Sequence, residues 1–320
     1  MLTEEERRFA GIFMPYALAK TDQVAAENSR FVHYTSAETA MKIIQSGRIW
    51  MRNAMTMNDF SEVSYGRNCL IQAYQDERVG GRLKAFLNGL FPNFTANFEA
   101  VFDSWLPHFE QDTYILSLSE HDAAEDVLGR LSMWRAYCPS NGVAIVVNNA
   151  PFSYASNELQ ASSSPVAYLN SVEFAVEFDK VTEGMMANEV TIRALGEQGA
   201  IGAVFQMFKS AILCTKHPGF AEEREWRVIY SPTQNLSRVI ERSFATVKGI
   251  PQEIHQIPLA HDPVNGLYQA DIPHLLDRII VGPSPQPFTM MRAFVRLLGE
   301  AGVPNPEQRV FVSEIPLRTG

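Results

Sequence analysis

The chain has 320 residues, of which 46% are hydrophobic, so it can bury a full core as one large domain or two small ones. Its formal net charge of −9 argues against broad binding to phosphate backbones, which needs clustered Lys and Arg, but still allows one small basic cleft. The cysteines Cys69, Cys138 and Cys214 lie far apart, which excludes a disulfide framework and a cysteine zinc site. No secretory signal and no apolar run of ~18 residues is evident, so we expect a cytoplasmic protein without a membrane partner.

Helical periodicity divides the chain into an extension and a main domain. Residues 1–30 predict an N-terminal helical extension, and 31–320 a single α+β domain. Within this domain we expect helical insertions near 66–112 and 184–214, and an amphipathic helix over 290–303.

Short β-branched and aromatic runs alternate irregularly with these helices. The Ser-, Ala- and Asn-rich stretch 148–168 predicts a loop or hinge between strands. The mixed order predicts an α+β fold with small curved mixed or antiparallel sheets, rather than a doubly wound parallel sheet. No G-x-G-x-x-G follows a strand, and no phosphate-binding P-loop motif is present. Strands are predicted over residues 30–34, 48–52, 113–119, 142–148, 167–174, 225–231, 277–283 and 308–315.

The first motif is FVHYTSAETAMKIIQSGRIWMRNAMTMNDFSE, in which a strand ends near His33. Thr35 and Glu38 match a T-x-x-E capping box that would start a helix, and Gly47 suits its left-handed end. The helix N-terminus would offer free N–H groups to an anion or a polarised hydroxyl beside the imidazole. A lone histidine at a strand end is more often a packed structural residue, so both interpretations remain open.

Two later segments add aromatic and charged side chains. Trp134 and Tyr137 lie three residues apart on one face of a predicted helix. They could form an aromatic wall for the flat ring of a ligand, or they could belong to the hydrophobic core. In CTKHPGFAEEREWRVIYSP, Glu223 and Glu225 would share one face of an extended chain. Such carboxylates can raise each other's pKa and stabilise a cationic transition state, or they can protect an edge strand from aggregation.

Several motifs resemble one bacterial family in content and order. They are FVHYTS, IIQSGRIWM, MNDFSE, ILSLSE, MWRAYCPSNGVAI, CTKHPGFAEEREWRV, RIIVGPSP and VFVSEIPLR. On these motifs the chain is identified as a member of the family catalogued as domain of unknown function number 2971, over about residues 31–318. The family name implies no activity.

A second resemblance is to ADP-ribosyltransferases with a His–Tyr–Glu triad, whose opening also runs strand, His-x-Thr/Ser, helix, glycine, strand. It implies a split sheet in which His33 binds the ribose hydroxyls of NAD and Tyr65 stacks on nicotinamide. Glu225, the second acid of the Glu223-x-Glu225 pair, would bind the 2′-hydroxyl of the nicotinamide ribose. Trp134 or Tyr137 could stack in place of Tyr65. The catalytic set implied is Glu225, Glu223 and His33, and the NAD-binding set is His33, Tyr34, Thr35, Tyr65, Trp134, Tyr137 and Arg227.

The implied reaction cleaves the nicotinamide–ribose bond through an oxocarbenium-like state, much as glycosides are hydrolysed. NAD would be the substrate, no metal is expected, and ADP-ribose would pass to a macromolecule, either protein or nucleic acid. By analogy the protein would be a toxin or an antiphage defence effector. Beside a charged acceptor the expected positive groups are Arg135, Lys216, Arg224 and Arg227.

Two other functions remain open. One is a non-catalytic nucleotide-sensing or protein-interaction domain, whose acidic loops would bind a partner. The other is a metal-dependent nuclease, because carboxylates suit Mg²⁺. Its candidate ligands are Asp59, Glu62, Asp122, Glu125 and Asp126.

Overall fold

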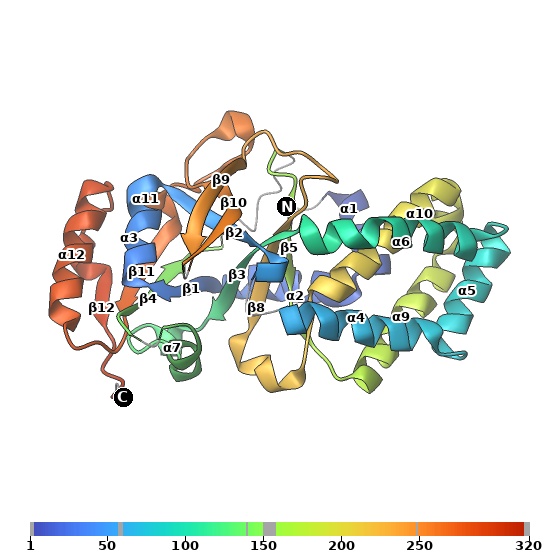
Figure 1. The fold of residues 1–320 in the computed structure, drawn as a ribbon, viewed down its shortest axis with the longest axis horizontal. Helices are drawn as coiled ribbons and strands as arrows, with labels where there is room; N and C mark the ends of the chain where they lie inside the picture. Colours follow the sequence, from blue (N-terminus) through green and yellow to red (C-terminus); the bar gives the residue numbers. More distant parts are fainter. Residues whose placement is uncertain (1–2, 57–59, 139, 150–157, 248, 317–320) are drawn as a thin grey trace.

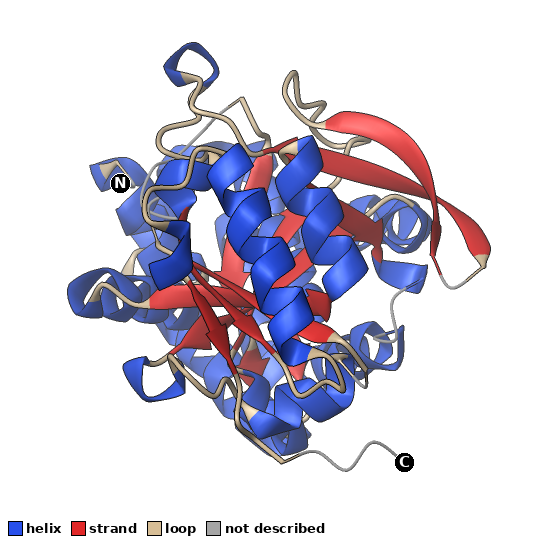
Figure 2. Ribbon diagram, turned by 90° about the vertical axis from the view of Figure 1, so that its left-hand side faces the viewer, coloured by secondary structure: helices blue, strands red, loops and turns tan. Residues whose placement is uncertain are grey.

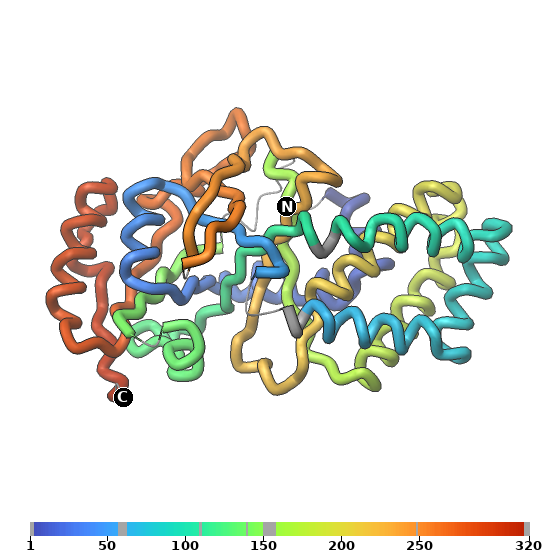
Figure 3. The backbone as a smooth tube through the Cα atoms, viewed as in Figure 1, coloured from blue at the N-terminus to red at the C-terminus, as the bar shows by residue number. Residues whose placement is uncertain are grey.

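A curved β-sheet and a block of helices lie next to each other along the longest axis of the molecule in the computed structural model (Figure 1). The predicted α+β class is confirmed, with a mixed sheet that is not closed into a barrel. Figure 3 shows segments 60–111 and 171–213 running side by side in the helical block, away from the C-terminal helix. The structure describes residues 3–56, 60–138, 140–149, 158–247 and 249–316.

The helices in the described part of the chain differ widely in length. None of them is both long and apolar enough to cross a membrane. Their bounds are α1 Glu4–Phe13, α2 Pro15–Glu27, α3 Ala37–Ser46, α4 Phe60–Gln75, α5 Val79–Leu90, α6 Phe94–Gln111, α7 Leu131–Tyr137, α9 Ser171–Ala187, α10 Glu189–Leu213, α11 Ile272–Leu275 and α12 Pro287–Glu300. The short 3₁₀ helices are η1 Ala54–Thr56, η2 Ala123–Glu125, η3 Pro218–Glu223, η4 Pro263–Asn265 and η5 Pro306–Gln308.

The strands form one large sheet and one small one. The two short strands β6 and β7 pair in parallel, separately from the rest. The bounds are β1 Arg30–Ser36, β2 Arg48–Asn53, β3 Tyr114–His121, β4 Gly142–Val147, β5 Ala161–Pro165, β6 Ala167–Tyr168, β7 Thr215–Lys216, β8 Glu225–Tyr230, β9 Glu241–Val247, β10 Ile250–Pro258, β11 Leu276–Val281 and β12 Val310–Val312.

Strand β3 is the branch point of the large sheet. Across the described residues the order is β12-β11-β4-β1-β3-β2-β10-β9, while β8 pairs with β3 and β5 with β8. Strand β8 follows one edge of β3 from Tyr114 to Ser119. The other edge is shared, because β2 pairs with Tyr114 and Ile115 whereas β1 pairs with Ser119 and the residues after it. Residues 116–118 of β3 therefore face a fork between β1 and β2.

Side chains alternate between the two faces of β1, and different helices cover these faces. Val32 and Tyr34 lie on the face covered by α7, where they join Trp134 in one buried cluster. His33 pairs with Ile145, whose side chain belongs to the opposite face. Helices α3 and α12 cover that second face, in front of the sheet in Figure 2. Neighbouring residues of β1 thus belong to different layers of the molecule.

The helical block has its own core, which is rich in phenylalanine. Helices α4, α5, α6, α9 and α10 pack around it, and Phe208 meets the rings of Phe98 and Phe102 edge-on. Ile115 of β3 and Ile229 of β8 belong to the same buried cluster. The block therefore packs directly on the two strands that carry the later motifs.

Most of the predicted elements are confirmed. The helices expected near 66–112 are α4, α5 and α6, those near 184–214 are the end of α9 and α10, and the helix over 290–303 is α12. Seven of the eight predicted strands are present at or close to their expected positions. Strands β9 and β10 were not expected, and β5 lies inside the stretch 148–168 that was expected to be a loop.

The strand predicted over 167–174 is wrong beyond its first two residues. Its sequence is AYLNSVEF, in which Asn170 accepts hydrogen bonds from the backbone N–H groups of Val172 and Glu173, both at 3.0 Å. Glu173 completes the capping box by accepting from the Asn170 N–H at 2.9 Å. This N-x-x-E pattern starts α9 and overrides the β-branched and aromatic content that suggested a strand.

The capping box predicted at Thr35 and Glu38 is also wrong. Strand β1 continues to Ser36, which caps α3 by accepting a hydrogen bond from the Thr39 N–H at 3.1 Å. Thr35 stays in the strand because β1 pairs with β4 up to that point. The left-handed end of α3 at Gly47 is confirmed, with φ of 59°.

Two glycines form the walls of the Trp134 site. A Cβ atom on Gly282 would lie 2.8 Å from the indole ring and 3.1 Å from the carbonyl oxygen of Gly142. A Cβ on Gly129 would lie 2.7 Å from the same ring, and its φ of 67° also favours glycine. The indole is therefore enclosed by backbone on two sides and by Tyr34 on a third, with ring centroids 4.8 Å apart.

We expect Gly282→Ala to lower the free energy of unfolding by about 1–3 kcal/mol, because the added methyl group overpacks the site between two rigid neighbours. Gly299→Ala is the matched control, since its Cβ meets nothing closer than Pro306 at 3.7 Å and alanine favours the helical backbone of α12. Urea unfolding of both variants measures the difference. Equal stability of the two variants would contradict the close packing around Trp134.

Candidate functional site

His33 fills the fork between β1 and β2. Its Nδ1 atom lies 3.1 Å from the carbonyl oxygen of Ser117, which belongs to the stretch of β3 without a strand partner on that edge. A carbonyl oxygen only accepts, so Nδ1 carries the proton of this hydrogen bond. Burial lowers the pKa of His33, although the Ser117 carbonyl opposes that shift. The neutral imidazole thus satisfies a backbone group that the split sheet leaves open.

The imidazole of His33 and the carboxylate of Glu225 point to opposite faces of the sheet. Val32 pairs with Ser119, and Ser119 pairs with Glu225, so these three side chains share one face. His33 follows Val32 in β1 and therefore points to the other face. The structure does not bring together the histidine and the acid that the ADP-ribosyltransferase resemblance pairs.

Glu225 belongs to a closed, buried ion network. Its Oε1 atom accepts from Nε of Arg227 at 2.8 Å, and its Oε2 atom accepts from Nζ of Lys216 at 2.9 Å. Lys216 also donates to Glu223 Oε2 at 2.6 Å. The residues Glu225, Arg227 and Lys216 are 5%, 1% and 0% exposed, respectively. Burial alone would raise the pKa of the Glu225 carboxyl, but the adjacent Arg227 and Lys216 cations outweigh it and hold that pKa at about 2.

We expect Glu225→Gln to lower the free energy of unfolding at pH 7 by about 3–5 kcal/mol, because it leaves two buried cations with one carboxylate fewer. Glu222→Gln, three residues earlier and exposed, should change stability by less than about 0.5 kcal/mol. Chemical denaturation of both variants gives the comparison. A Glu225→Gln protein as stable as the wild type would show that the network does not hold this region together.

The same variant gives a pH prediction. The folded pKa of Glu225 lies below its ordinary value of 4.5, so its contribution to stability is complete above pH 4.5 and is lost as the pH falls toward 2. The stability difference between wild type and Glu225→Gln should be smaller at pH 3.5 than at pH 7, by about 1.4 kcal/mol. Denaturation curves at the two pH values test this, and an unchanged difference would mean that the carboxyl titrates normally.

Most of the aromatic residues in the predicted NAD-binding set are structural. Tyr34 accepts a hydrogen bond from the Arg130 N–H at 2.8 Å, and burial raises its pKa to about 12. Trp134 is fully buried and donates to the Leu128 carbonyl oxygen at 2.9 Å. Neither ring is open to a ligand.

Tyr65 and Thr35 are also placed in structural contacts. Tyr65, on α4, donates its hydroxyl proton to the carbonyl oxygen of Leu169 at 2.9 Å, and its ring meets that of His217. The carbonyl oxygen of Thr35 accepts from the Cys138 thiol at 3.3 Å. Tyr137 differs from the others, because 39% of it is exposed and its hydroxyl donates to Glu223 Oε1 at 2.9 Å.

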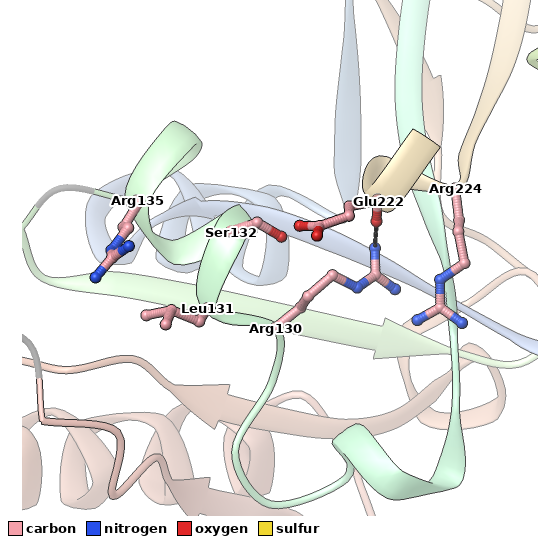
Figure 4. Close-up of a pocket in the computed structure, with 6 residues that line it drawn as sticks. All are labelled: Arg130, Leu131, Ser132, Arg135, Glu222 and Arg224. Carbon is pink, nitrogen blue, oxygen red and sulfur yellow. Dashed lines mark hydrogen bonds between the residues drawn. The ribbon is translucent and has the colours of Figure 1, made fainter. Parts of the chain in front are cut away.

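An open cavity of about 530 Å³ lies between α7 and η3 (Figure 4). We call it the arginine cleft. Helix α7 provides one wall and the segment from η3 to the start of β8 provides the other, although α7 ends at Tyr137 and η3 begins only at Pro218. The residues that line it are Arg130, Leu131, Ser132, Arg135, Glu222 and Arg224.

The three arginines of this cleft differ in what they bind. Arg130 donates to Glu125 Oε1 at 2.9 Å and to the carbonyl oxygen of Glu222 at 2.7 Å, so it ties α7 to η3. Arg224 is paired with Glu125 and with Asp122. Arg135 is exposed and has no ion pair within the described residues. It is therefore the cation of the cleft that an anionic ligand would meet first.

Three of the five acids proposed for a nuclease are counterions of arginines. Asp122 and Glu125 hold the cleft arginines, while Asp126 pairs with Arg30 at 2.6 Å and with Arg278 at 3.0 Å. Asp59 lies outside the described residues, and the side chain of Glu62 is not described either. Within the described part, no group of three or more His, Cys, Asp or Glu side chains is arranged to hold a metal ion.

Residues 133–228 match the model of a family described as protein of unknown function, DUF2971. The predicted family is confirmed over this range. The matched segment begins in α7 and ends in β8, so it contains Arg135, Tyr137 and the whole ion network around Glu225. Neither a curated protein nor a solved structure matches the chain.

Sequence reasoning named Arg135 and Arg224 but missed the rest of the cleft. Arg130, Ser132 and Glu222 contribute to the same cavity. The signal available in the sequence was the charge pattern EHDAAEDVLGR, in which several acids precede one arginine. That pattern suggests ion pairs but does not identify η3 as the opposite wall.

Proposed function

We propose that the arginine cleft of the DUF2971 segment binds NAD and that the protein cleaves its nicotinamide–ribose bond. The observation that carries the proposal is Arg135, which lines an open cleft, is exposed and has no ion pair among the described residues. Tyr137, which is 39% exposed, lies two residues further along α7. A volume of about 530 Å³ suits a nucleotide, since small-molecule sites commonly span roughly 300–1,000 Å³.

Arg135 is the group we assign to the phosphates. A guanidinium binds phosphate oxygens through two parallel N–H donors, and these bonds are stronger than those between neutral groups. Because Arg135 has no counterion among the described residues, a phosphate there replaces only water. The cation projects from α7, a helix held in place by the enclosed Trp134.

Glu223, rather than Glu225, is the acid we assign to the reaction. Its carboxylate is held between Nζ of Lys216 at 2.6 Å and the hydroxyl of Tyr137 at 2.9 Å, at the border of the cleft. A fixed carboxylate next to an exposed aromatic ring suits a leaving nicotinamide and a positive charge developing on ribose. Glu225 would then act through Lys216, as a positioning residue.

A non-catalytic nucleotide sensor is the second candidate. Both oxygens of Glu223 already accept hydrogen bonds, which favours a structural role for this carboxylate. A sensor would bind the same nucleotide in the same cleft but would release no nicotinamide. Transfer of ADP-ribose to a macromolecule, and a role as a toxin or in antiphage defence, belong to the enzyme alternative alone.

We expect Arg135→Ala to weaken NAD binding about 10-fold, which is the loss of roughly 1.4 kcal/mol from a charge-assisted contact, without a change in melting temperature. Arg292→Ala changes another exposed arginine, on α12, and is the control, which should bind NAD like the wild type. Calorimetric titration measures the affinities.

Nicotinamide release, followed by chromatography, separates the two candidates. Glu223→Gln should bind NAD and release no nicotinamide if the protein is an enzyme. If the wild type binds NAD but releases no nicotinamide, the protein is a nucleotide sensor and not an enzyme. If the wild type does not bind NAD, both the enzyme and the sensor proposals are overturned.

A further inference from the structure

The arginine at the far end of the cleft is already occupied by carboxylates of the protein itself. Figure 4 shows Arg135 at one end and Arg224 at the other, with Ser132 and Arg130 between them. One terminal nitrogen of Arg224 is bound by Asp122 and the other by Glu125. Carboxylate oxygens thus hold both donors of the fork that a phosphate would use.

The two carboxylates differ in how easily they can leave. Glu125 is 16% exposed and also binds Arg130, so it is part of the framework. The side chain of Asp122 is 63% exposed, and solvation can replace its contact with Arg224 at little free energy. Asp122 is therefore the removable partner.

The backbone keeps Arg224 in place without Asp122. Arg224 has φ of 45°, in the left-handed region, where the chain turns from η3 into β8. Its carbonyl oxygen accepts from the Glu120 N–H at 2.9 Å, which fixes this turn against β3. With Glu125 still bound, the guanidinium would remain directed at the cleft after Asp122 leaves.

We infer that Arg224 is a phosphate subsite covered by Asp122, and that it receives a backbone phosphate of a single-stranded nucleic acid. This inference rests on the proposed function, in which the strand is the acceptor of ADP-ribose. A dinucleotide whose pyrophosphate binds at Arg135 would leave Arg224, at the opposite end of the cleft in Figure 4, to a phosphate of another ligand. A second ligand with its own phosphates fits that end.

Charge and ring exposure favour a nucleic-acid strand over an acidic protein. Phe220 of η3 is 46% exposed, and such a ring offers a stacking surface to an unpaired base. A carboxylate from a protein acceptor would only exchange one carboxylate for another at Arg224. A phosphate would take the terminal nitrogen of Arg224 that Asp122 releases, while Glu125 stays on the other one.

The test compares wild type with Asp122→Asn, in which asparagine keeps the cap of η2 but loses the charge. Asp22→Asn removes an exposed acid paired with Arg7, outside the cleft, and serves as the matched control. Binding of a fluorescent single-stranded hexanucleotide is measured without NAD at several salt concentrations, with hexaglutamate as a competitor.

We expect Asp122→Asn to bind the hexanucleotide at least about 5-fold more tightly than wild type, and the plot of log K against log salt to steepen by roughly 0.7 for the one added phosphate contact. Asp22→Asn should match the wild type in both respects. An unchanged affinity and salt slope in Asp122→Asn would overturn the subsite, as would hexaglutamate that competes as well as unlabelled hexanucleotide. Absence of NAD binding by the wild type is a separate result, which removes the proposed reaction and leaves the measured nucleic-acid subsite standing.

Discussion

The buried network of Lys216, Glu225 and Arg227 is the interaction on which the rest of the cleft depends. Two cations and one carboxylate are almost completely removed from water, and a second carboxylate, Glu223, reaches them from the border of the cleft. Buried charges are tolerated only when each is paired in good geometry, so this network permits little variation in how η3 meets β8. It therefore fixes one wall of the cavity and the turn at Arg224.

The opposite wall depends on packing rather than on charge. Trp134 is enclosed by glycine backbone and by Tyr34, and this holds α7 against the sheet. Arg130 then bridges the two walls through Glu125 and the carbonyl oxygens of η3. Asp122 and Glu125, which follow β3, are the counterions of the cleft residues Arg130 and Arg224. These acids explain how a chain with a net charge of −9 contains a cluster of cations. Arg135 has no such counterion among the described residues, and for that reason it is the centre of the proposed ligand site.

The fork between β1 and β2 explains why His33 suggested a ligand site in the sequence although its partner is the protein backbone. The histidine in the middle of β1 does have a specific polar task, since it binds the Ser117 carbonyl oxygen at the fork. That task is internal, however, and the strand register directs the imidazole away from the face that carries Glu225. A histidine in a short apolar run shows that a polar group is needed there, but the run does not show whether the partner is a ligand or the backbone.

The sequence by itself determined the α+β class, the positions of α4, α5, α6 and α10 in the helical block, the left-handed end of α3 at Gly47 and the family resemblance of residues 133–228. These features depend on local periodicity, on capping and on short motifs, all of which involve residues close together in the chain. Only the tertiary structure decided that Glu225 is a buried counterion, that Trp134 is core, and that α7 and η3 enclose one cavity. Those outcomes depend on strand register and on hydrogen bonds between residues about 90 positions apart, such as the bond from Arg130 to the carbonyl oxygen of Glu222. Pairing over such distances is set by how the whole chain buries its apolar surface, and no local pattern encodes it.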